Sequence, residues 1–405
     1  WQRDYANVTP AGSIEWTPRP FVFVAGSRIR YIDYEAGSDS NDGTERTRPW
    51  EHHPWDSAAV GKAKAASGID TYVFKGGVYY RGALTVREGG RPGHPIRLTR
   101  DPSWGNGPAV ICGSERIGGW QQGARHPDIP EPERVWYADL TFMPRTVWLV
   151  DDAGQDATRI PLARSPNWTY SNPDDMKEQW WSWTNEPHPF KNEAGNRNVG
   201  CDSRNVTGRS PDYFKGALIW PEFGWVMGAP YPTRVERVDV QKHSLAFAGW
   251  TGGGSGGIIF RHMRYYLEDK PHYLDDPNGE FWFERKGKGG RLYIRLPGDA
   301  DPNQARIEVG KRQDLIYGTD VNHLDISGLD FRFTTPAWDL TVVAWDFRTK
   351  PWSFREDAHP ACIRVWGKGT GIRIANCRFR DVVFPIRLRA LNGSEEIDDV
   401  LIEDN

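Results

Sequence analysis

Short stretches of alternating apolar and polar residues recur towards the C-terminal end of the chain. The copies are 323–331, 371–379 and 399–405, which read HLDISGLDF, GIRIANCRF and DVLIEDN. In each copy, branched apolar residues alternate with polar ones, as in a strand with one buried face. We expect the sharp bend that follows to be made by Gly328, Asn376 and Asn405, because these residue types tolerate the left-handed conformation. Strands that repeat at roughly 20 to 30 residues are typical of a solenoid of stacked parallel strands.

A similar succession of short strands is predicted near the N-terminus. Residues 1–28 read as a polar, extended arm, and 57–67 (SAAVGKAKAAS) is an early segment with a helical apolar face. Short strands then follow at 71–74, 84–86, 96–99 and 110–112. A helix that covers one end of a coil, followed by the first coils, accounts for residues 29–114. The predicted fold class is therefore all-β, a right-handed parallel β-helix of the pectate-lyase-like kind.

The repeating pattern of short strands is interrupted between residues 115 and 302. Loops rich in Trp, Pro and Asn dominate this segment, and the strands between them read as antiparallel pairs. We therefore predict an inserted antiparallel β-rich domain at 115–302. The β-helix strands resume at 303–405. Because a solenoid needs a cap over its last strand, we expect further strands beyond residue 405.

Composition and charge narrow the classes of function. The chain has 405 residues and a formal net charge of −3, which gives no general attraction to nucleic acid or to anionic membranes. No apolar run reaches the roughly 18 residues of a membrane span. The first residue is Trp1, so we expect a secreted, cell-surface or periplasmic protein whose signal peptide has been removed. Twenty tryptophans offer flat apolar faces that suit sugar rings, although most of them are expected in cores and at loop bases.

Cysteine spacing and acidic loops give little sign of a metal or cofactor. The four cysteines are widely separated and lack the spacing of zinc or haem sites. Cys362 and Cys377 read as buried core residues, with a disulfide between them as the alternative in an exported protein. The loop 37–44 (GSDSNDGT) has acidic spacing close to that of a calcium loop, with Asp39 and Asp42 as ligands. Gly43 falls where a third ligand is needed, so a hydrogen-bonded cap loop is the interpretation that the sequence favours.

Several of these segments resemble a known group of proteins. The N-terminal ones resemble the cap of secreted right-handed parallel β-helix proteins and are 31–33 (YID), 37–44 (GSDSNDGT), 49–50 (PW) and 73–79 (VFKGGVY). The later ones are similar to the inserted β-domain of that group and are 147–150 (VWLV), 163–167 (ARSPN), 264–269 (RYYLED), 274–283 (LDDPNGEFWF) and 291–298 (RLYIRLPG). The chain is most similar to the β-helix glycosidases of glycoside hydrolase family 141 and their relatives. This resemblance implies the architecture and a glycoside hydrolase acting on a complex polysaccharide.

Two other kinds of function use the same architecture. One is a polysaccharide lyase that acts on a uronate-containing glycan. The other is a non-enzymatic adhesive or assembly-forming surface protein. Such a protein would assemble with other chains through the open end of the β-helix, where the last strand has an unpaired edge.

Glycoside hydrolysis requires two carboxyl groups roughly 5 to 10 Å apart. Acidic residues on the same face of adjacent strands, which stack about 4.8 Å apart, meet this requirement. The catalytic candidates are Asp381, which directly follows a strand, and Asp357. His359, near the end of a long loop, is a candidate acid or base. The competing interpretation is that acids in turns are solvated surface groups.

Arginines alternate with apolar residues along three of the last strands, so we expect the apolar side chains inside and the arginines outside. The candidate substrate-binding arginines are Arg364, Arg373, Arg387 and Arg389. On stacked strands they would form a stripe that pairs with uronate or sulfate groups, unless they are ordinary charged residues of an exposed face. Nearby tryptophans form either a sugar-binding wall or a lid for the long loop, and these are Trp338, Trp345, Trp352 and Trp366. Trp181, in the insert, is a further candidate platform.

Overall fold

The computed structural model describes residues 6–151, 154, 156–169, 176–184, 197–222, 232–248, 262–336 and 360–405. The described elements are mainly strands, which confirms the prediction of an all-β protein. The chain divides into two compact units. The parallel unit comprises Trp1–Glu115, Gly310–Thr335 and Pro360–Asn405, and the antiparallel unit includes Arg116–Val309. Within the ranges above, no helix has the length and hydropathy that a membrane span requires.

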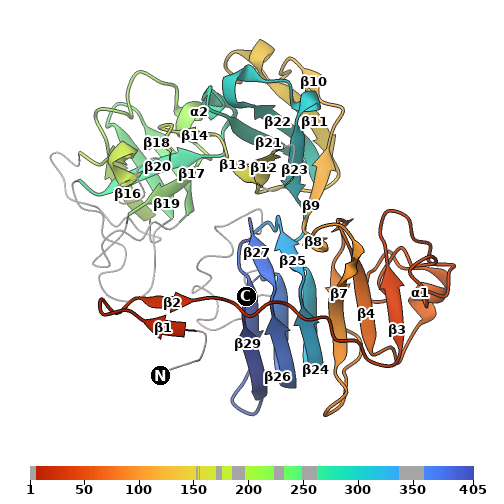
Figure 1. The fold of residues 1–405 in the computed structure, drawn as a ribbon. Helices are drawn as coiled ribbons and strands as arrows, with labels where there is room; N and C mark the ends of the chain where they lie inside the picture. The colour runs from red at the N-terminus through yellow and green to blue at the C-terminus, as the bar shows by residue number, and fades with distance from the viewer. Residues whose placement is uncertain are drawn as a thin grey trace. The chain divides into compact units, whose positions relative to one another are not determined.

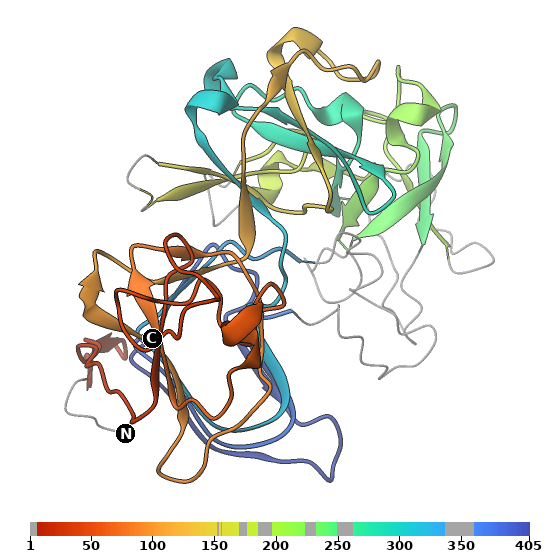
Figure 2. The ribbon, with the colours of Figure 1, turned by 90° about the vertical axis from the view of Figure 1, so that its right-hand side faces the viewer.

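Two parallel sheets make up the body of the parallel unit (Figure 1). The larger sheet contains β3 (Ile29–Ile32), β4 (Thr71–Gly76), β6 (Leu84–Thr85), β7 (Ile96–Gly105), β24 (Ile316–Ser327), β26 (Ile363–Ala375), β28 (Ile386–Arg389) and β29 (Ile397–Glu403). The smaller sheet contains β5 (Tyr79–Tyr80), β8 (Val110–Cys112), β25 (Asp330–Arg332) and β27 (Arg378–Arg380). The chain passes from one sheet to the other and back, so that β24 and β25 pair in register with β26 and β27. Figure 2 looks along the stacking direction and shows successive segments overlaid.

Like residues stack on like residues in the larger sheet. One column contains Ile96, Leu324, Ile372 and Val400, and the next contains Leu98, Ile326, Ile374 and Ile402. The members on β7, β24 and β26 are at most 5 % exposed. Burying one such side chain fully contributes about 1.5–3 kcal/mol. These columns therefore stabilise the unit, and they explain why the alternating pattern repeats in the sequence.

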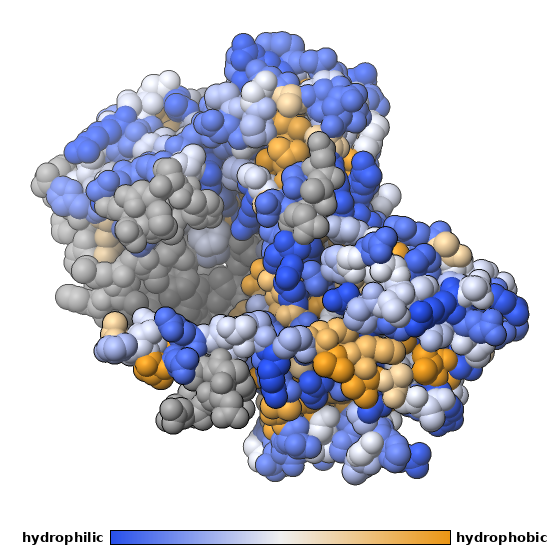
Figure 3. Space-filling model, in the orientation of Figure 1, coloured by the Kyte–Doolittle hydropathy of each residue, from blue (hydrophilic) through white to orange (hydrophobic). Residues whose placement is uncertain are grey.

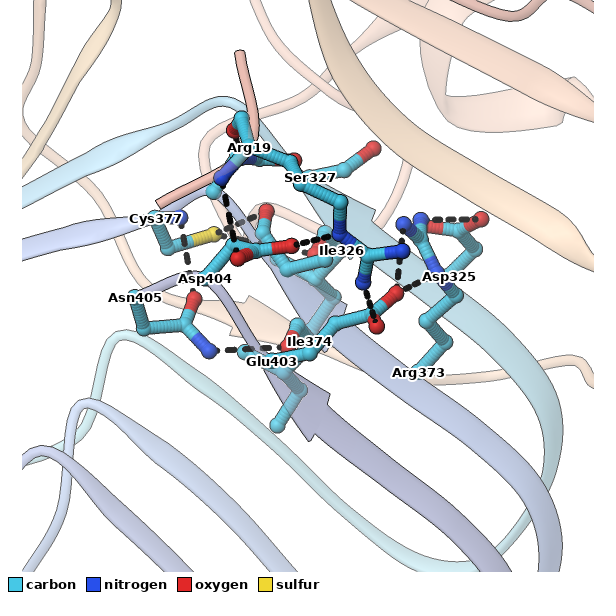
Figure 4. Close-up of polar contacts among 12 residues, drawn as sticks. Arg19, Asp325, Ile326, Ser327, Arg373, Ile374, Cys377, Glu403, Asp404 and Asn405 are labelled. Carbon is cyan, nitrogen blue, oxygen red and sulfur yellow. Dashed lines mark hydrogen bonds and ion pairs between the residues drawn. The ribbon is translucent and has the colours of Figure 1, made fainter. Parts of the chain in front are cut away.

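The bends between strands also recur in register. Positive φ angles occur at Gly328 (+68°), Asn376 (+51°) and Asp404 (+55°), at the ends of β24, β26 and β29. They occur again at the preceding bend of each copy, at His323, Gly371 and Asp399. The three-copy repeat is thus confirmed, with one correction. The bend residue of the third copy is Asp404, and the prediction of Asn405 was wrong because Asn405 instead uses its side chain to accept from the Cys377 N–H and donate to the Ile374 carbonyl (Figure 4).

The core cysteines are buried, as the sequence predicts. Cys362 is fully buried and Cys377 is 3 % exposed. Both are free thiols, and the Cys377 Sγ lies 3.4 Å from the Ala375 carbonyl oxygen. Burial raises the pKa of Cys362 well above its ordinary value and that of Cys377 to about 12. Both side chains therefore act as small core residues.

The N-terminal arm runs across the bends of the parallel unit (Figure 1). Residues 6–16 form a hairpin of β1 (Ala6–Val8) and β2 (Ile14–Trp16), and the segment after it is extended without a strand partner. Arg19 holds this segment at the last bends, because its Nε donates to Asp404 at 2.8 Å and its Nη2 pairs with Glu403. Figure 3 shows apolar residues gathered where the arm crosses the unit, and Val22 is 73 % exposed there.

Replacing Arg19 by alanine is expected to loosen the arm around this residue without unfolding the unit. Exposed ion pairs contribute little to global stability, and the Arg19 backbone keeps its hydrogen bonds with Asp404 and Asn376, so the effect should be local. We expect limited proteolysis within residues 6–28 to accelerate by about two- to fivefold, with an unchanged near-ultraviolet circular dichroism spectrum. Glu15→Ala, in the exposed strand β2, is the matched control. Equal cleavage of Arg19→Ala and wild type would show that other contacts hold the arm.

The antiparallel unit contains three sheets among its described residues. The first has the order β10 (Gln121–Gln122), β11 (Trp136–Leu140), β22 (Gly289–Arg295) and β21 (Glu280–Lys286). The second has the order β13 (Ala157–Ile160), β12 (Val147–Val150), β23 (Arg306–Gly310) and β9 (Ser114–Ile117). The third is built from β14 (Arg164–Ser165), β15 (Trp181–Ser182), β16 (Arg197–Cys201), β17 (Leu218–Pro221), β18 (Thr233–Asp239), β19 (Ser244–Ala248) and β20 (Arg264–Glu268). The strand pairs that define these sheets, such as β11 with β22, β12 with β13 and β17 with β20, are antiparallel.

Helices are short and few among the described residues. The predicted helix at 57–67 is reduced to α1 (Gly61–Ala65), and α2 (Pro211–Phe214) is shorter still. Val60, the residue before α1, has an extended backbone and makes no side-chain cap. Asp39 instead accepts hydrogen bonds from N–H groups at the start of the helix. The Asp39 carboxylate accepts from the Val60 and His52 N–H groups, and its backbone carbonyl accepts from those of Lys62 and Ala63. Burial of Ala63 alone is too little to extend the helix.

Candidate functional site

Four of the sequence-predicted binding residues lie on adjacent strands of the larger sheet. Arg364 on β26 is opposite Arg387 on β28, and Trp366 on β26 is opposite Arg389. Tyr317, on β24, lies opposite Arg364 on its other side. Since side chains two residues apart on a strand share a face, these five residues lie on one face. We call them the arginine face.

Arg364 is at the centre of this face, but it does not point freely into solvent. Its side chain is buried, and its Nε and Nη2 donate to the two carboxylate oxygens of Asp314 at 2.9 and 2.7 Å. Its guanidinium also lies 4.1 Å from the centre of the Trp366 ring. Alternation places Arg364 on the face opposite the core residues Ile363 and Val365, but there a bidentate carboxylate and an aromatic ring replace its water.

Arg387 and Arg389 form the outer part of the arginine face. Arg387 is half-buried, and Arg389 is exposed. Burial lowers the pKa of Arg387 from its ordinary value, and the neighbouring cations Arg389 and Arg364 lower it further, against the opposing effect of Asp314. Arg387 therefore lies partly buried beside two other guanidinium groups and the Asp314 carboxylate.

The fourth arginine of the predicted stripe, Arg373, has a different setting (Figure 4). It lies on β26 beyond the bend, where its Nη1 is 3.2 Å from both Asp325 carboxylate oxygens. Its Nη2 donates to Glu403, also at 3.2 Å. Two carboxylates on neighbouring strands therefore neutralise Arg373. Its side chain links β26 to β24 on one side and to β29 on the other. The prediction of one continuous cationic stripe was wrong at this position.

The catalytic candidate Asp381 is engaged in an ion pair. It follows β27, has a φ of +57°, and accepts from Nε and Nη2 of Arg332 at 3.2 and 2.7 Å. The Arg332 side chain is 1 % exposed, and that of Asp381 is 21 % exposed. The Asp381 carboxylate is therefore engaged by a buried guanidinium through two hydrogen bonds, which suits a structural role. Asp357, His359, Trp338, Trp345 and Trp352 lie outside the described residues.

Trp181 lies in the antiparallel unit. It pairs opposite Tyr265, and the two rings meet edge to face with centroids 5.8 Å apart. Its neighbours Trp180 and Trp183 are buried, whereas Trp181 is half-exposed. Trp181 is therefore the member of this run that retains a partly accessible ring face.

The loop considered for calcium is held together by hydrogen bonds. Asp39 is buried and accepts from the His52 and Val60 N–H groups, and it lies 3.0 Å from the His52 ring nitrogen Nδ1. Asp42 accepts from the N–H and hydroxyl of Thr44, which lower the pKa of its carboxyl. Both carboxylates therefore accept hydrogen bonds within the loop or from its neighbours, as in the hydrogen-bonded cap loop that the sequence favoured.

Sequence reasoning missed Asp314 and Tyr317. Asp314 lies two residues before β24, and Tyr317 is the second residue of that strand. The signal for Tyr317 was its outward position beside the apolar Ile316. No local signal identifies Asp314, since its partner Arg364 is 50 residues away in the chain.

Comparison with known proteins identifies a solved structure with a similar fold. No protein-family model matches the sequence, and no curated protein matches it. A solved structure described as "Glycoside hydrolase" is similar at a TM-score of 0.60 and 16 % identity, over 88 % of this chain and 62 % of that chain. Another, "The complex structure of XylC with xylose", has a TM-score of 0.37 and 12 % identity, over 87 % of this chain and 54 % of that one. The chain thus spans about three fifths of the first protein's length and shares its fold.

Proposed function

We propose that this protein is an extracellular glycoside hydrolase acting on an acidic polysaccharide, of the kind found in family 141. In this proposal the parallel unit is part of a right-handed parallel β-helix, and the antiparallel unit is inserted into it. The shared fold with a protein described as a glycoside hydrolase supports the class of activity. The sequence motifs of the cap and of the insert support the family.

The observation that carries the choice of substrate is the presence of two arginines side by side on the arginine face. Arg387 and Arg389 lie on β28, two residues apart on the same face, opposite Arg364 and Trp366 of β26. A sugar carboxylate or sulfate accepts from guanidinium groups, and the partly exposed Tyr317 offers an aromatic ring on the same face, where Trp366 is buried. In this proposal the arginine face binds the glycan, and hydrolysis requires two carboxyl groups besides it.

The same face also supports a polysaccharide lyase as the second candidate. A lyase neutralises the uronate carboxylate with cations before a base removes the adjacent proton. The arginine face provides such cations. A hydrolase consumes water and leaves no double bond, whereas a lyase creates an unsaturated product that absorbs ultraviolet light.

Incubation with neutral and acidic polysaccharides separates these reactions. New reducing ends without new ultraviolet absorbance are expected, and they would establish a hydrolase. Both signals together would indicate the lyase. If neither signal appears on any polysaccharide, the enzymatic proposal fails and the adhesive or assembly function takes its place.

Binding to polygalacturonate is expected to weaken about tenfold in Arg387→Gln and in Arg389→Gln, because each variant removes a charge-assisted hydrogen bond. The affinity of the wild type should also fall with rising salt concentration. Arg378→Gln, at an exposed position of β27, removes the same charge from the other sheet and serves as the control. Affinity that falls equally in all three variants would indicate general charge attraction and would contradict a site at the arginine face.

A further inference from the structure

A small cavity lies in the parallel unit, between the N-terminal cap and the first strands. Its polar lining includes Tyr34, Glu51, His53 and Asp56, and apolar side chains such as Phe74 and Leu84 complete the wall. The cavity opens to solvent, and its enclosed part has space for about one water-sized group. None of these residues belongs to the arginine face.

His53 presents a buried donor without a partner. Its side chain is 2 % exposed, and its Nδ1 accepts from the Trp55 N–H at 2.9 Å, so Nε2 carries the ring proton. Burial lowers the pKa of His53 well below its ordinary value, which keeps the ring neutral. Nε2 is buried and has no hydrogen-bond partner among the described residues. Leaving such a donor unpaired costs about 1–3 kcal/mol, which a bound acceptor would offset.

Asp56 supplies an acceptor in the same wall. The residue is 7 % exposed, and its Oδ1 accepts from the Ala58 N–H at 2.8 Å. Its Oδ2 lies against Gly82, where an added Cβ would come within 2.0 Å of it. Glycine at position 82 therefore leaves room for the carboxylate. Glu51 adds a second carboxylate, with 43 % of its side chain exposed.

The charges and hydrogen-bonding groups of the cavity select the chemistry of its ligand. The carboxylates of Asp56 and Glu51 disfavour an anion, and the N–H of His53 disfavours a cation. Tyr34 remains a neutral phenol, because burial and the nearby Glu115 raise its pKa. A hydroxyl group both donates and accepts, so it can satisfy His53 and Asp56 together.

We propose that this cavity binds the hydroxymethyl group of a neutral sugar or polyol, with the hydroxyl accepting from His53 Nε2–H and donating to the Asp56 carboxylate. The methylene group packs against the apolar wall, and the rest of the ligand extends past Glu51 towards solvent. The site is separate from the arginine face and takes an uncharged group, so the two can be tested independently.

Calorimetric titration of the full chain with D-glucose and D-xylose tests this site. The two sugars differ in the hydroxymethyl group, which xylose lacks. Glucose is expected to bind at least about tenfold more tightly, because xylose leaves the buried polar groups unpaired. Equal binding of the two sugars would overturn the assignment. If glucose does not bind at all, a water molecule fills the cavity and the proposal fails, while polygalacturonate binding at the arginine face is unaffected.

Two variants localise the binding. Asp56→Asn keeps the acceptor for the Ala58 N–H but replaces the second oxygen by a donor, so glucose affinity should fall by about tenfold. Glu51→Gln, at the exposed rim, should lower it by about two- to threefold. Glu45→Gln makes the same charge change at an exposed position of the cap loop and should have no effect. Unchanged glucose affinity in Asp56→Asn would overturn the proposal, and if that variant does not fold, Glu51→Gln and the comparison of the two sugars still decide it.

Discussion

Asp381→Asn is expected to destabilise the parallel unit by about 3 kcal/mol. The substitution removes the carboxylate that pairs with the buried Arg332 guanidinium, and arginine cannot lose its charge to compensate. Asparagine tolerates the positive φ of this position as well as aspartate does, so the backbone adds little to the loss. Urea unfolding followed by circular dichroism measures the effect.

The matched control is Asp398→Asn, an exposed acid on β29 in the same unit, which should change stability by less than about 0.5 kcal/mol. The double variant Arg332→Met with Asp381→Asn should recover part of the lost stability, because it leaves no buried charge. If Asp381→Asn keeps wild-type stability and instead abolishes glycan cleavage, Asp381 is catalytic and its structural role is refuted.

Acidification below pH 6.5 is expected to weaken the parallel unit through His53. Burial depresses the pKa of His53 in the folded state, whereas the unfolded chain binds a proton near pH 6.5. Above that pH both states are neutral at this residue, and the stability is fully present. Below it the unfolded state binds more protons, so the free energy of unfolding falls by up to about 1.4 kcal/mol per pH unit until the folded pKa is reached.

The contribution of His53 is measured as a difference between two proteins. Urea unfolding of the wild type and of His53→Asn at pH 7, 6 and 5 separates it from that of other titrating groups. Asparagine offers an oxygen near the position of Nδ1 for the Trp55 N–H but does not titrate. The variant should be less stable at pH 7 because of lost packing, and its stability should depend less on pH. Parallel pH dependences for the two proteins would contradict the assignment to His53.

Local sequence patterns were sufficient for the strands and bends of the repeat. Ile326 and Ile374 occupy equivalent positions because alternation with polar residues has the period of a strand, and the structure stacks them in register. Gly328 and Asn376 mark their bends because few residue types tolerate a positive φ. The third bend was predicted one residue too late, at Asn405. Aspartate at position 404 tolerates the same left-handed conformation as asparagine, and the bend is made there.

The candidate site was predicted less completely, because the partners of its charges are distant in sequence. Alternation placed Arg364 and Arg373 outside the core, but it does not reveal what each one meets there. Asp314 and Glu403 are brought to them by the pairing of whole strands. The sequence suggested that both arginines are free cations. In the structure Arg364 forms a buried ion pair, and Arg373 links neighbouring strands.

The sequence by itself determined the all-β class, the repeating strands and bends, and the grouping of arginines with aromatic residues on the last strands. These features depend on backbone preferences and on the strand period, which act over a few neighbouring residues. Tertiary structure alone decided which carboxylates pair with Arg364 and Arg373, that Asp381 is held by Arg332, and that His53 and Asp56 line one cavity. Such outcomes depend on burial and on partners tens of residues away in the chain, and a local pattern contains neither.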